Sequence, residues 1–317
     1  MSLTLELVAP SGYPNDPASV TRAMARLERE GVTVRGLEVA ARRFERFAGN
    51  DDERLNDLNR LADPKRALAD IVMAVRGGYG ASRLLDRLDY AGLRARLEGA
   101  PTMIVGHSDF TAIQLALYAR AGLVTFGGPM LAGNFGALDA NYSAFTQAHF
   151  WRAVRDKSLT IESSRPQAHT LNVGGTLWGG NLAMIASLVG TPYLPVVDGG
   201  ILFLEDIAER PYRIERMFYQ LHQAGVLARQ QAIVLGDFQQ SDPMPYDNGY
   251  GVPEVVAHVR ALTGKPVLSG LRFGHGDDLL TLPVGGRAQL HCDPDGFVME
   301  ITGYPCVGHA QPAVQAG

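Results

Sequence analysis

A serine follows an apolar run near residue 108. Residues 103–106 have the composition of a buried strand, and His107, Ser108 and Asp109 come next, ahead of a helix-like pattern. A sharp strand-to-helix turn lifts a serine hydroxyl clear of the sheet and leaves the first N–H groups of the helix free to bind an anion. The turn therefore predicts a nucleophile beside an oxyanion donor. Phe110 stands where a hydrolase elbow has glycine, and an ordinary helix-capping serine is the alternative.

A serine nucleophile needs a base that is oriented by a third group. Of the eight histidines, His275 stands in a loop between two glycines, which permit close backbone approach. Glu205 directly follows the apolar residues 201–204. A charged side chain at the end of a buried strand is costly unless it is paired with another group or has a functional role. These residues are candidates for base and orienting acid, with a plain loop role for His275 and helix capping for Glu205 as alternatives. His107 is expected to point away from the serine on a tight turn.

The glycine-rich segment from Arg76 to Gly80 follows another apolar run. It lacks the GxGxxG spacing and the GK[ST] ending of nucleotide-binding loops, so no dinucleotide is expected. Its backbone could instead approach a substrate carbonyl and, together with the N–H of Asp109, form an oxyanion hole. Asp277 and Asp278 beside His275 lack further ligands at metal spacing and are expected to be solvated, so we predict no metal and no other cofactor.

The elements that must position these residues alternate between strand-like and helix-like segments in the first half. Strands are expected at 3–8, 32–39, 70–75 and 103–106, with a charged helix over 51–61. This alternation predicts a parallel sheet covered by helices, which places ligands at the carboxyl ends of its strands. In the second half, residues 281–302 alternate like antiparallel strands around a turn at 293–296.

Composition narrows the class of protein. The length of 317 residues favours two α/β domains, divided near residue 160 into 1–160 and 161–317. A net charge of −4 gives no polyanion-binding surface, so nucleic acid is not an expected partner. No window is apolar enough to span a membrane, and the first ten residues lack a basic n-region. The chain has only two cysteines, so we expect both to be free thiols and the protein to be cytoplasmic.

Together these segments resemble the LD-carboxypeptidases, a family of serine peptidases with a Ser-Glu-His triad. The resemblance covers nearly the whole chain through residues 76–83, 106–112, 175–182, 204–206 with 211–216, and 273–275 before 281–283. It implies Ser108 as nucleophile, Glu205 as acid and His275 as base, with the backbone amides of Gly78 and Asp109 as the oxyanion hole. It also implies a cleft between an N-terminal α/β domain that bears Ser108 and a C-terminal domain that bears Glu205 and His275.

The resemblance further implies a homodimer that releases the C-terminal D-alanine of murein tetrapeptides during cell-wall recycling. Arg76 is the candidate for binding the terminal carboxylate, and Trp178 and Asn181 are candidates for lining the cleft, with a buried aromatic role as the alternative for Trp178. Two rival functions stay open. Relatives of this family inactivate peptide-nucleotide antibiotics as self-immunity enzymes, and a non-catalytic α/β binding protein could use the same cleft without chemistry.

Overall fold

The computed structural model describes residues 3–308, and its N-terminal half is built on a six-stranded sheet in the order β11-β5-β4-β3-β1-β2. Strands β1 to β5 are parallel, whereas β11 is antiparallel to β5. Strands β3 and β4 are buried throughout, as expected for parallel strands covered on both faces. The strands are β1 (Leu3–Val8), β2 (Val32–Arg35), β3 (Ile71–Ala74), β4 (Met103–Gly106), β5 (Thr125–Gly127) and β11 (Leu282–Val284), and the helices are α1 (Pro17–Arg29), α2 (Asp51–Asn59), α3 (Tyr90–Leu97), α4 (Thr111–Ala121) and α5 (Ala144–Arg155).

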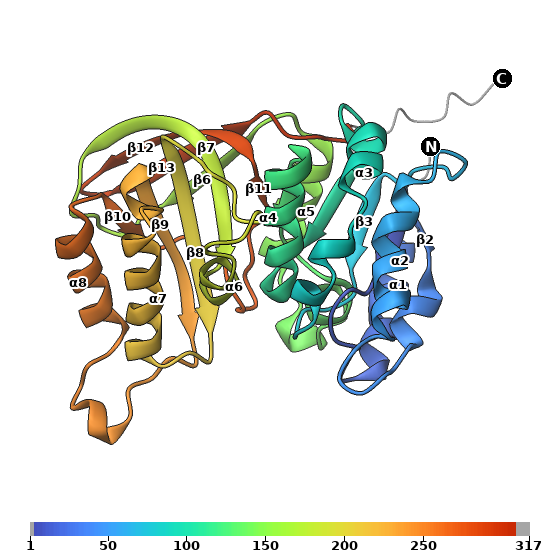
Figure 1. The fold of residues 1–317 in the computed structure, drawn as a ribbon, viewed down its shortest axis with the longest axis horizontal. Helices are drawn as coiled ribbons and strands as arrows, with labels where there is room; N and C mark the ends of the chain where they lie inside the picture. The colour runs from blue at the N-terminus through green and yellow to red at the C-terminus, as the bar shows by residue number, and fades with distance from the viewer. Residues whose placement is uncertain (1–2, 309–317) are drawn as a thin grey trace.

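The second sheet has seven strands in the order β10-β9-β8-β7-β12-β13-β6. Strands β7 to β10 are parallel, and β12, β13 and β6 continue the sheet in antiparallel pairs. Figure 1 shows the two sheets side by side, with α7 and α8 on the far side of the second sheet from the first. The strands are β6 (Leu159–Ser163), β7 (Leu171–Asn181), β8 (Gly200–Ile207), β9 (Gln230–Gln239), β10 (Val267–Ser269), β12 (Gly286–Asp293) and β13 (Gly296–Thr302), and the helices are α6 (Leu182–Ser187), α7 (Pro211–Gln223) and α8 (Val252–Thr263).

The predicted fold class is confirmed, with a mostly parallel N-terminal sheet and antiparallel strands in the C-terminal one. Two details differ from the sequence-based prediction. The strand expected over 32–39 ends at Arg35, because Gly36 adopts a left-handed conformation with φ 75° and begins a short 3₁₀ turn. Of the strands expected over 281–302, β11 joins the N-terminal sheet instead, and Gly285 at φ 103° turns the chain back into β12.

The two halves are joined by packing as well as by β11. Helix α4, which begins just after Ser108, packs against α6 and β7 of the other half (Figure 1). Residues that follow β4 therefore lie next to the ends of β7 and β8. None of the helices within residues 3–308 combines the length and the apolar character needed to cross a membrane.

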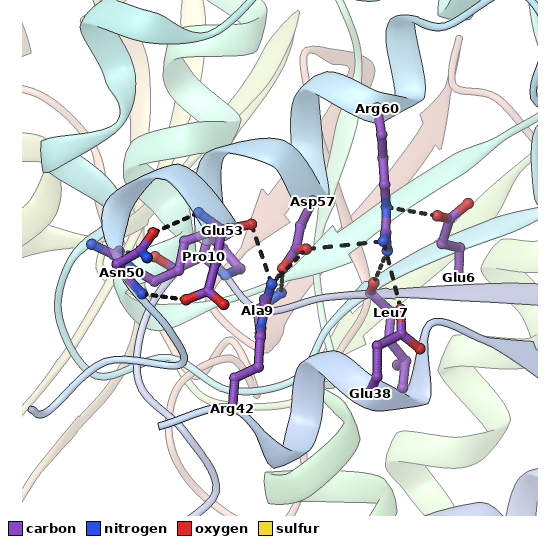
Figure 2. A network of polar contacts seen from close by, with 11 residues as sticks. Glu6, Leu7, Ala9, Pro10, Glu38, Arg42, Asn50, Glu53, Asp57 and Arg60 are labelled. Atoms are coloured by element: carbon purple, nitrogen blue, oxygen red, sulfur yellow. Dashed lines mark hydrogen bonds and ion pairs between the residues drawn. The ribbon is translucent and has the colours of Figure 1, made fainter. Parts of the chain in front are cut away.

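Helix α2 is anchored to the end of β1 by buried ion pairs (Figure 2). Asp57 accepts a hydrogen bond from the backbone N–H of Ala9 at 3.0 Å and pairs with Arg42. Arg60 pairs with Glu6 at 2.9 Å. Because one carboxylate satisfies both a guanidinium and a buried amide, the chain leaving β1 is held in place at the carboxyl edge of the sheet.

Candidate active site

Ser108 lies in a strained backbone turn between β4 and α4. Its φ is +62°, a left-handed value that non-glycine residues rarely adopt. Such strain persists only where the surroundings hold it, and it concentrates at functional sites. Here the surroundings include Gly77, since a Cβ built on that residue would lie 2.9 Å from the Ser108 Cβ and 3.0 Å from its Oγ. The glycine-rich segment therefore approaches the serine at Gly77, the neighbour of the Gly78 that was assigned to the oxyanion hole.

The side chain of Asp109 joins the loops on either side of the serine. Its Oδ2 accepts hydrogen bonds from Ser11 Oγ at 2.6 Å and from the backbone N–H of Ala81 at 2.9 Å. Burial raises the pKa of Asp109, and these two hydrogen bonds oppose that rise. Arg54, fully buried on α2, donates to the carbonyls of Pro10 and Gly80. The side chains of Asp109, Ser11 and Arg54 thus hold the loops after β1, β3 and β4 together. No motif in the sequence indicated these side-chain contacts.

His275 and Glu205 come together from different elements of the C-terminal half. Glu205 is fully buried near the end of β8, and its Oε2 lies 2.8 Å from His275 Nδ1. The second oxygen, Oε1, accepts from Asn181 Nδ2 at 3.2 Å. Burial acts to lower the pKa of His275, but the hydrogen bond and charge of Glu205, with a contribution from Asp206, outweigh it and raise that pKa. The imidazole is therefore oriented and made more basic by the carboxylate.

A cavity of about 610 Å³ contains both Ser108 and His275. Its walls come from both halves of the chain and combine the glycine-rich segment, the serine turn, the residues before and within α5, and the histidine loop. The lining residues are Arg76, Gly77, Gly78, His107, Ser108, Met130, Gly133, Asn134, Ala137, Leu138, Asn141, Ser143, Thr146, Gln147, Ile207, His275, Gly276 and Asp277. The cavity therefore brings together the hydroxyl of Ser108, the imidazole of His275 and the guanidinium of Arg76. With the imidazole paired to Glu205, this set of groups suits acyl transfer.

Models of the two LD-carboxypeptidase domains match the chain, the N-terminal domain over residues 5–128 and the C-terminal domain over residues 174–290. A probable murein peptide carboxypeptidase of Bacillus subtilis is 31% identical over 300 residues, covering 94% of this chain and 91% of the relative. The chain belongs to the LD-carboxypeptidase family. It is accordingly a serine carboxypeptidase, and the family resemblance inferred from the motifs is confirmed.

Two further likenesses concern different substrates. The crystal structure of a muramoyltetrapeptide carboxypeptidase from Oxalobacter formigenes matches with a TM-score of 0.87 and 41% identity, covering 95% of this chain and 99% of that one. The microcin C7 self-immunity protein MccF of Escherichia coli is 30% identical, covering 87% of this chain and 88% of that protein. Both likenesses span nearly the full length, so they do not by themselves separate the two substrates.

His107 lies in the site of this LD-carboxypeptidase rather than away from it, contrary to the prediction. Its Nδ1 donates to the carbonyl of Gly128 at 2.9 Å, and its ring meets that of His275 edge to face with centroids 5.2 Å apart. Burial, with the nearby charge of His275, lowers the pKa of His107 to about 3. A ring that stays neutral at physiological pH packs against the imidazole of His275 without competing with it for a proton.

The structure separates the three candidate substrate-binding residues. Arg76 lines the cavity, and its Nη1 donates to the carbonyl of Tyr13 at 3.2 Å. Trp178 does not line the cavity, because it is fully buried in the central strand β7 and donates its indole N–H to Gln230. It takes the alternative role of a core aromatic. Asn181 is 5% exposed and contacts Glu205 rather than the cavity, so it positions the carboxylate.

Thr146 connects the histidine loop to the N-terminal half. Its hydroxyl donates to the carbonyl of Asp277 and accepts from the N–H of Leu279, both at 2.8 Å. Nearby, Asn141 donates to the Asp277 carboxylate at 3.1 Å. Asp278 also accepts a hydrogen bond from Ser143. Asp277 is exposed to solvent, as expected, and both acidic residues take part in this contact as well. Within residues 3–308, no group of three or more His, Cys, Asp or Glu side chains is arranged to hold a metal ion.

Replacing Thr146 by valine tests this connection, because valine has the same shape without the hydroxyl. The change removes the hydrogen bond to the partly buried carbonyl of Asp277 and leaves the buried N–H of Leu279 without a partner, the latter at a cost of about 1–3 kcal/mol. We expect a lower melting temperature and a kcat reduced by roughly tenfold, a magnitude that corresponds to about 1.4 kcal/mol in the transition state. Thr146→Ser keeps the hydroxyl and should restore both quantities. A wild-type kcat in Thr146→Val would show that the contact does not position His275.

Proposed function

We propose that the protein removes the C-terminal D-alanine from murein tetrapeptides through a triad of Ser108, His275 and Glu205. The observation that carries the proposal is the 2.8 Å contact between His275 Nδ1 and Glu205 Oε2, in a cavity that His275 shares with Ser108. With Nδ1 donating to the carboxylate, Nε2 is the ring nitrogen left to accept a proton. This arrangement supports the proposed roles of Ser108 as nucleophile, His275 as base and Glu205 as orienting acid.

In the proposed reaction, His275 Nε2 takes the proton of the Ser108 hydroxyl while Oγ attacks the carbonyl that precedes D-alanine. The backbone N–H groups of Gly78 and Asp109 are the proposed donors to the oxyanion that forms. The protonated His275 then gives its proton to the leaving nitrogen of D-alanine, and an acyl-enzyme remains on Ser108. Water, deprotonated by His275, attacks this ester and releases the shortened peptide.

Arg76 is the proposed partner of the substrate's terminal carboxylate. It lines the cavity beside the segment that contains Gly77 and Gly78, and the only hydrogen bond of its guanidinium within the described residues goes to a backbone carbonyl. A guanidinium with free donors suits a carboxylate, which it can bind through two parallel hydrogen bonds. This places the end of the peptide next to the proposed oxyanion hole.

Incubation with a murein tetrapeptide tests the function directly. We expect free D-alanine and the corresponding tripeptide, detected by mass spectrometry, and no product from the same peptide ending in L-alanine. The likeness to a microcin self-immunity protein makes a peptide-nucleotide conjugate the second substrate to test. Cleavage of the conjugate without release of D-alanine would replace the first proposal by the second.

The proposal also covers the oligomeric state, the location, the cellular role and the domain division of the protein. We propose a cytoplasmic homodimer that acts in murein recycling, and a division into domains 1–160 and 161–317. Support for the division comes from the two sheets, each built almost entirely from one half of the chain, with β11 as the exception. Sedimentation of the purified protein at several concentrations would test the dimer.

A further inference from the structure

The imidazole of His107 has one ring nitrogen that the fold uses and one that it leaves free. Nδ1 lies 2.9 Å from the carbonyl oxygen of Gly128. Because a carbonyl only accepts hydrogen bonds, Nδ1 carries the proton, and Nε2 of the neutral ring keeps a lone pair that can accept one. Burial, with the charge of His275, lowers the pKa of His107, so this lone pair stays available at physiological pH.

The contact with Gly128 fixes the ring, because the ends of β4 and β5 are bonded to each other at this place. The N–H of Gly128 donates to the carbonyl of Gly106 at 3.0 Å. Gln114, from helix α4, donates to the same carbonyl at 3.2 Å and to that of Phe126 at 2.6 Å. The ends of two neighbouring strands therefore determine where Nε2 lies, and a rotation of the ring would break its hydrogen bond to Gly128.

The free nitrogen is open to the cavity. His107 is only 5% exposed, and it lines the cavity together with Ser108 and His275. Among the described residues, Nε2 has no hydrogen-bond partner, yet it is not one of their fully buried polar atoms without a partner. Nε2 is therefore reached from the cavity that the ring lines. A ligand that fills the cavity removes water from this acceptor, and binding is weaker unless the ligand brings a donor.

The position of the ring limits which ligand atoms reach it. His107 directly precedes Ser108 in the chain, and its ring meets that of His275 edge to face with centroids 5.2 Å apart. A substrate group beside Nε2 is therefore close to the bond that Ser108 attacks in the proposed reaction. The main chain of a peptide has two donors in this neighbourhood, which are the N–H of the scissile bond and the N–H of the preceding peptide bond.

We propose that His107 is a substrate-binding residue whose Nε2 accepts a hydrogen bond from a main-chain N–H of the peptide, at the scissile bond or at the bond before it. The inference rests on the proposed peptidase function and extends it, because it adds a residue that selects amide substrates. A substrate with an ester oxygen in place of this N–H leaves a buried acceptor without a partner, and such a mismatch is what makes a hydrogen-bonding site selective.

Kinetics on three related substrates test the contact in the wild type and in His107→Phe, which keeps a ring against His275 but has no acceptor. The substrates are the tetrapeptide and two analogues in which an ester oxygen replaces one N–H, either that of the scissile bond or that of the preceding bond. The ratio of wild-type to variant kcat/KM on each substrate cancels the intrinsic reactivity of the ester. We expect this ratio to be about tenfold larger for the tetrapeptide than for the analogue that lacks the contacted N–H. The analogue that shows the difference identifies which N–H is bound.

His107→Asn is the matched control for the contact with Gly128. Its side-chain amide can still donate to that carbonyl, as Nδ1 does, but it places no acceptor where Nε2 lies. We expect the same dependence on substrate as in His107→Phe. Equal ratios on all three substrates in His107→Phe would overturn the proposal, because the ring would then act only through packing. Wild-type kcat/KM for the tetrapeptide in His107→Asn would overturn it as well, because the contact with Gly128 would then be sufficient.

The inference and the proposed function fail in different ways. Release of D-alanine together with equal ratios would contradict the role of His107 and leave the proposed function standing. A wild type that releases no D-alanine would contradict the proposed function. In that case, calorimetry with Ser108→Ala, with and without His107→Phe, compares the affinity for the tetrapeptide and its two analogues without turnover. Equal affinities for all three ligands in both proteins, or no binding, would then overturn the inference too.

Discussion

Ser108→Ala should abolish peptide cleavage while leaving substrate binding intact. In serine peptidases the loss of the nucleophile costs on the order of 10⁶-fold in kcat, because the residues of a triad act as a unit. Active-site titration and single-turnover kinetics would measure this loss, and calorimetry with the tetrapeptide would show unchanged affinity. Residual activity within tenfold of the wild type would remove Ser108 from the reaction.

The backbone of Ser108 supplies a control for this experiment. Alanine at φ +62° is strained as serine is, whereas glycine adopts this conformation freely. Ser108→Gly should therefore be as inactive as Ser108→Ala but more stable, by about 1 kcal/mol in the free energy of unfolding. Inactivity together with increased stability would separate loss of the hydroxyl from damage to the fold. It would also indicate that strain at this turn is retained for function.

Glu205→Gln should reduce kcat by roughly 10³–10⁴-fold, as loss of the orienting carboxylate does in other serine peptidases. The amide keeps the size of the side chain, but it can no longer stabilise the imidazolium that forms when His275 takes the serine proton. The hydrogen bond at 2.8 Å and the full burial of Glu205 make this the second largest expected effect. Steady-state kinetics on the tetrapeptide would measure it.

The pH profile gives the same prediction a second readout. A base must be neutral to act, so kcat/KM should fall as pH decreases through the pKa of His275. Glu205 raises that pKa, so its replacement by glutamine should move the acid limb to lower pH. Asp206→Asn is the matched control, because it removes a neighbouring charge with a smaller effect on His275. If the acid limb of the kcat/KM profile does not move in Glu205→Gln, or moves equally in both variants, the role assigned to Glu205 is contradicted.

Local patterns were sufficient to predict several elements of the site. The apolar run before Ser108 and the run before Glu205 form β4 and β8, and both candidate residues lie close to the carboxyl ends of these strands. A parallel strand covered by helices is apolar along most of its length, so the first polar residue after such a run indicates that the carboxyl end is near; Glu205 lies two residues before the end of β8. The glycines around His275 marked a backbone that approaches its neighbours closely, and Gly274 indeed lies against Asp237.

Other residues gave no local sign of their place in the site. Trp178 and Asn181 belong to a motif of the family, yet the structure places one in the core and the other behind Glu205. Arg54 and Ser11 hold the loops around Ser108 from distant parts of the chain. Such contacts depend on which strands are neighbours, and periodicity within a segment carries no information about that.

The sequence by itself determined the fold class, the family and the residues of the proposed triad, because strand ends, glycine turns and motif spacing are local properties of the chain. Only the tertiary structure decided that β11 crosses into the first sheet and that His107 packs on His275. These facts follow from packing and electrostatics between segments far apart in the chain, which form only when the two sheets come together.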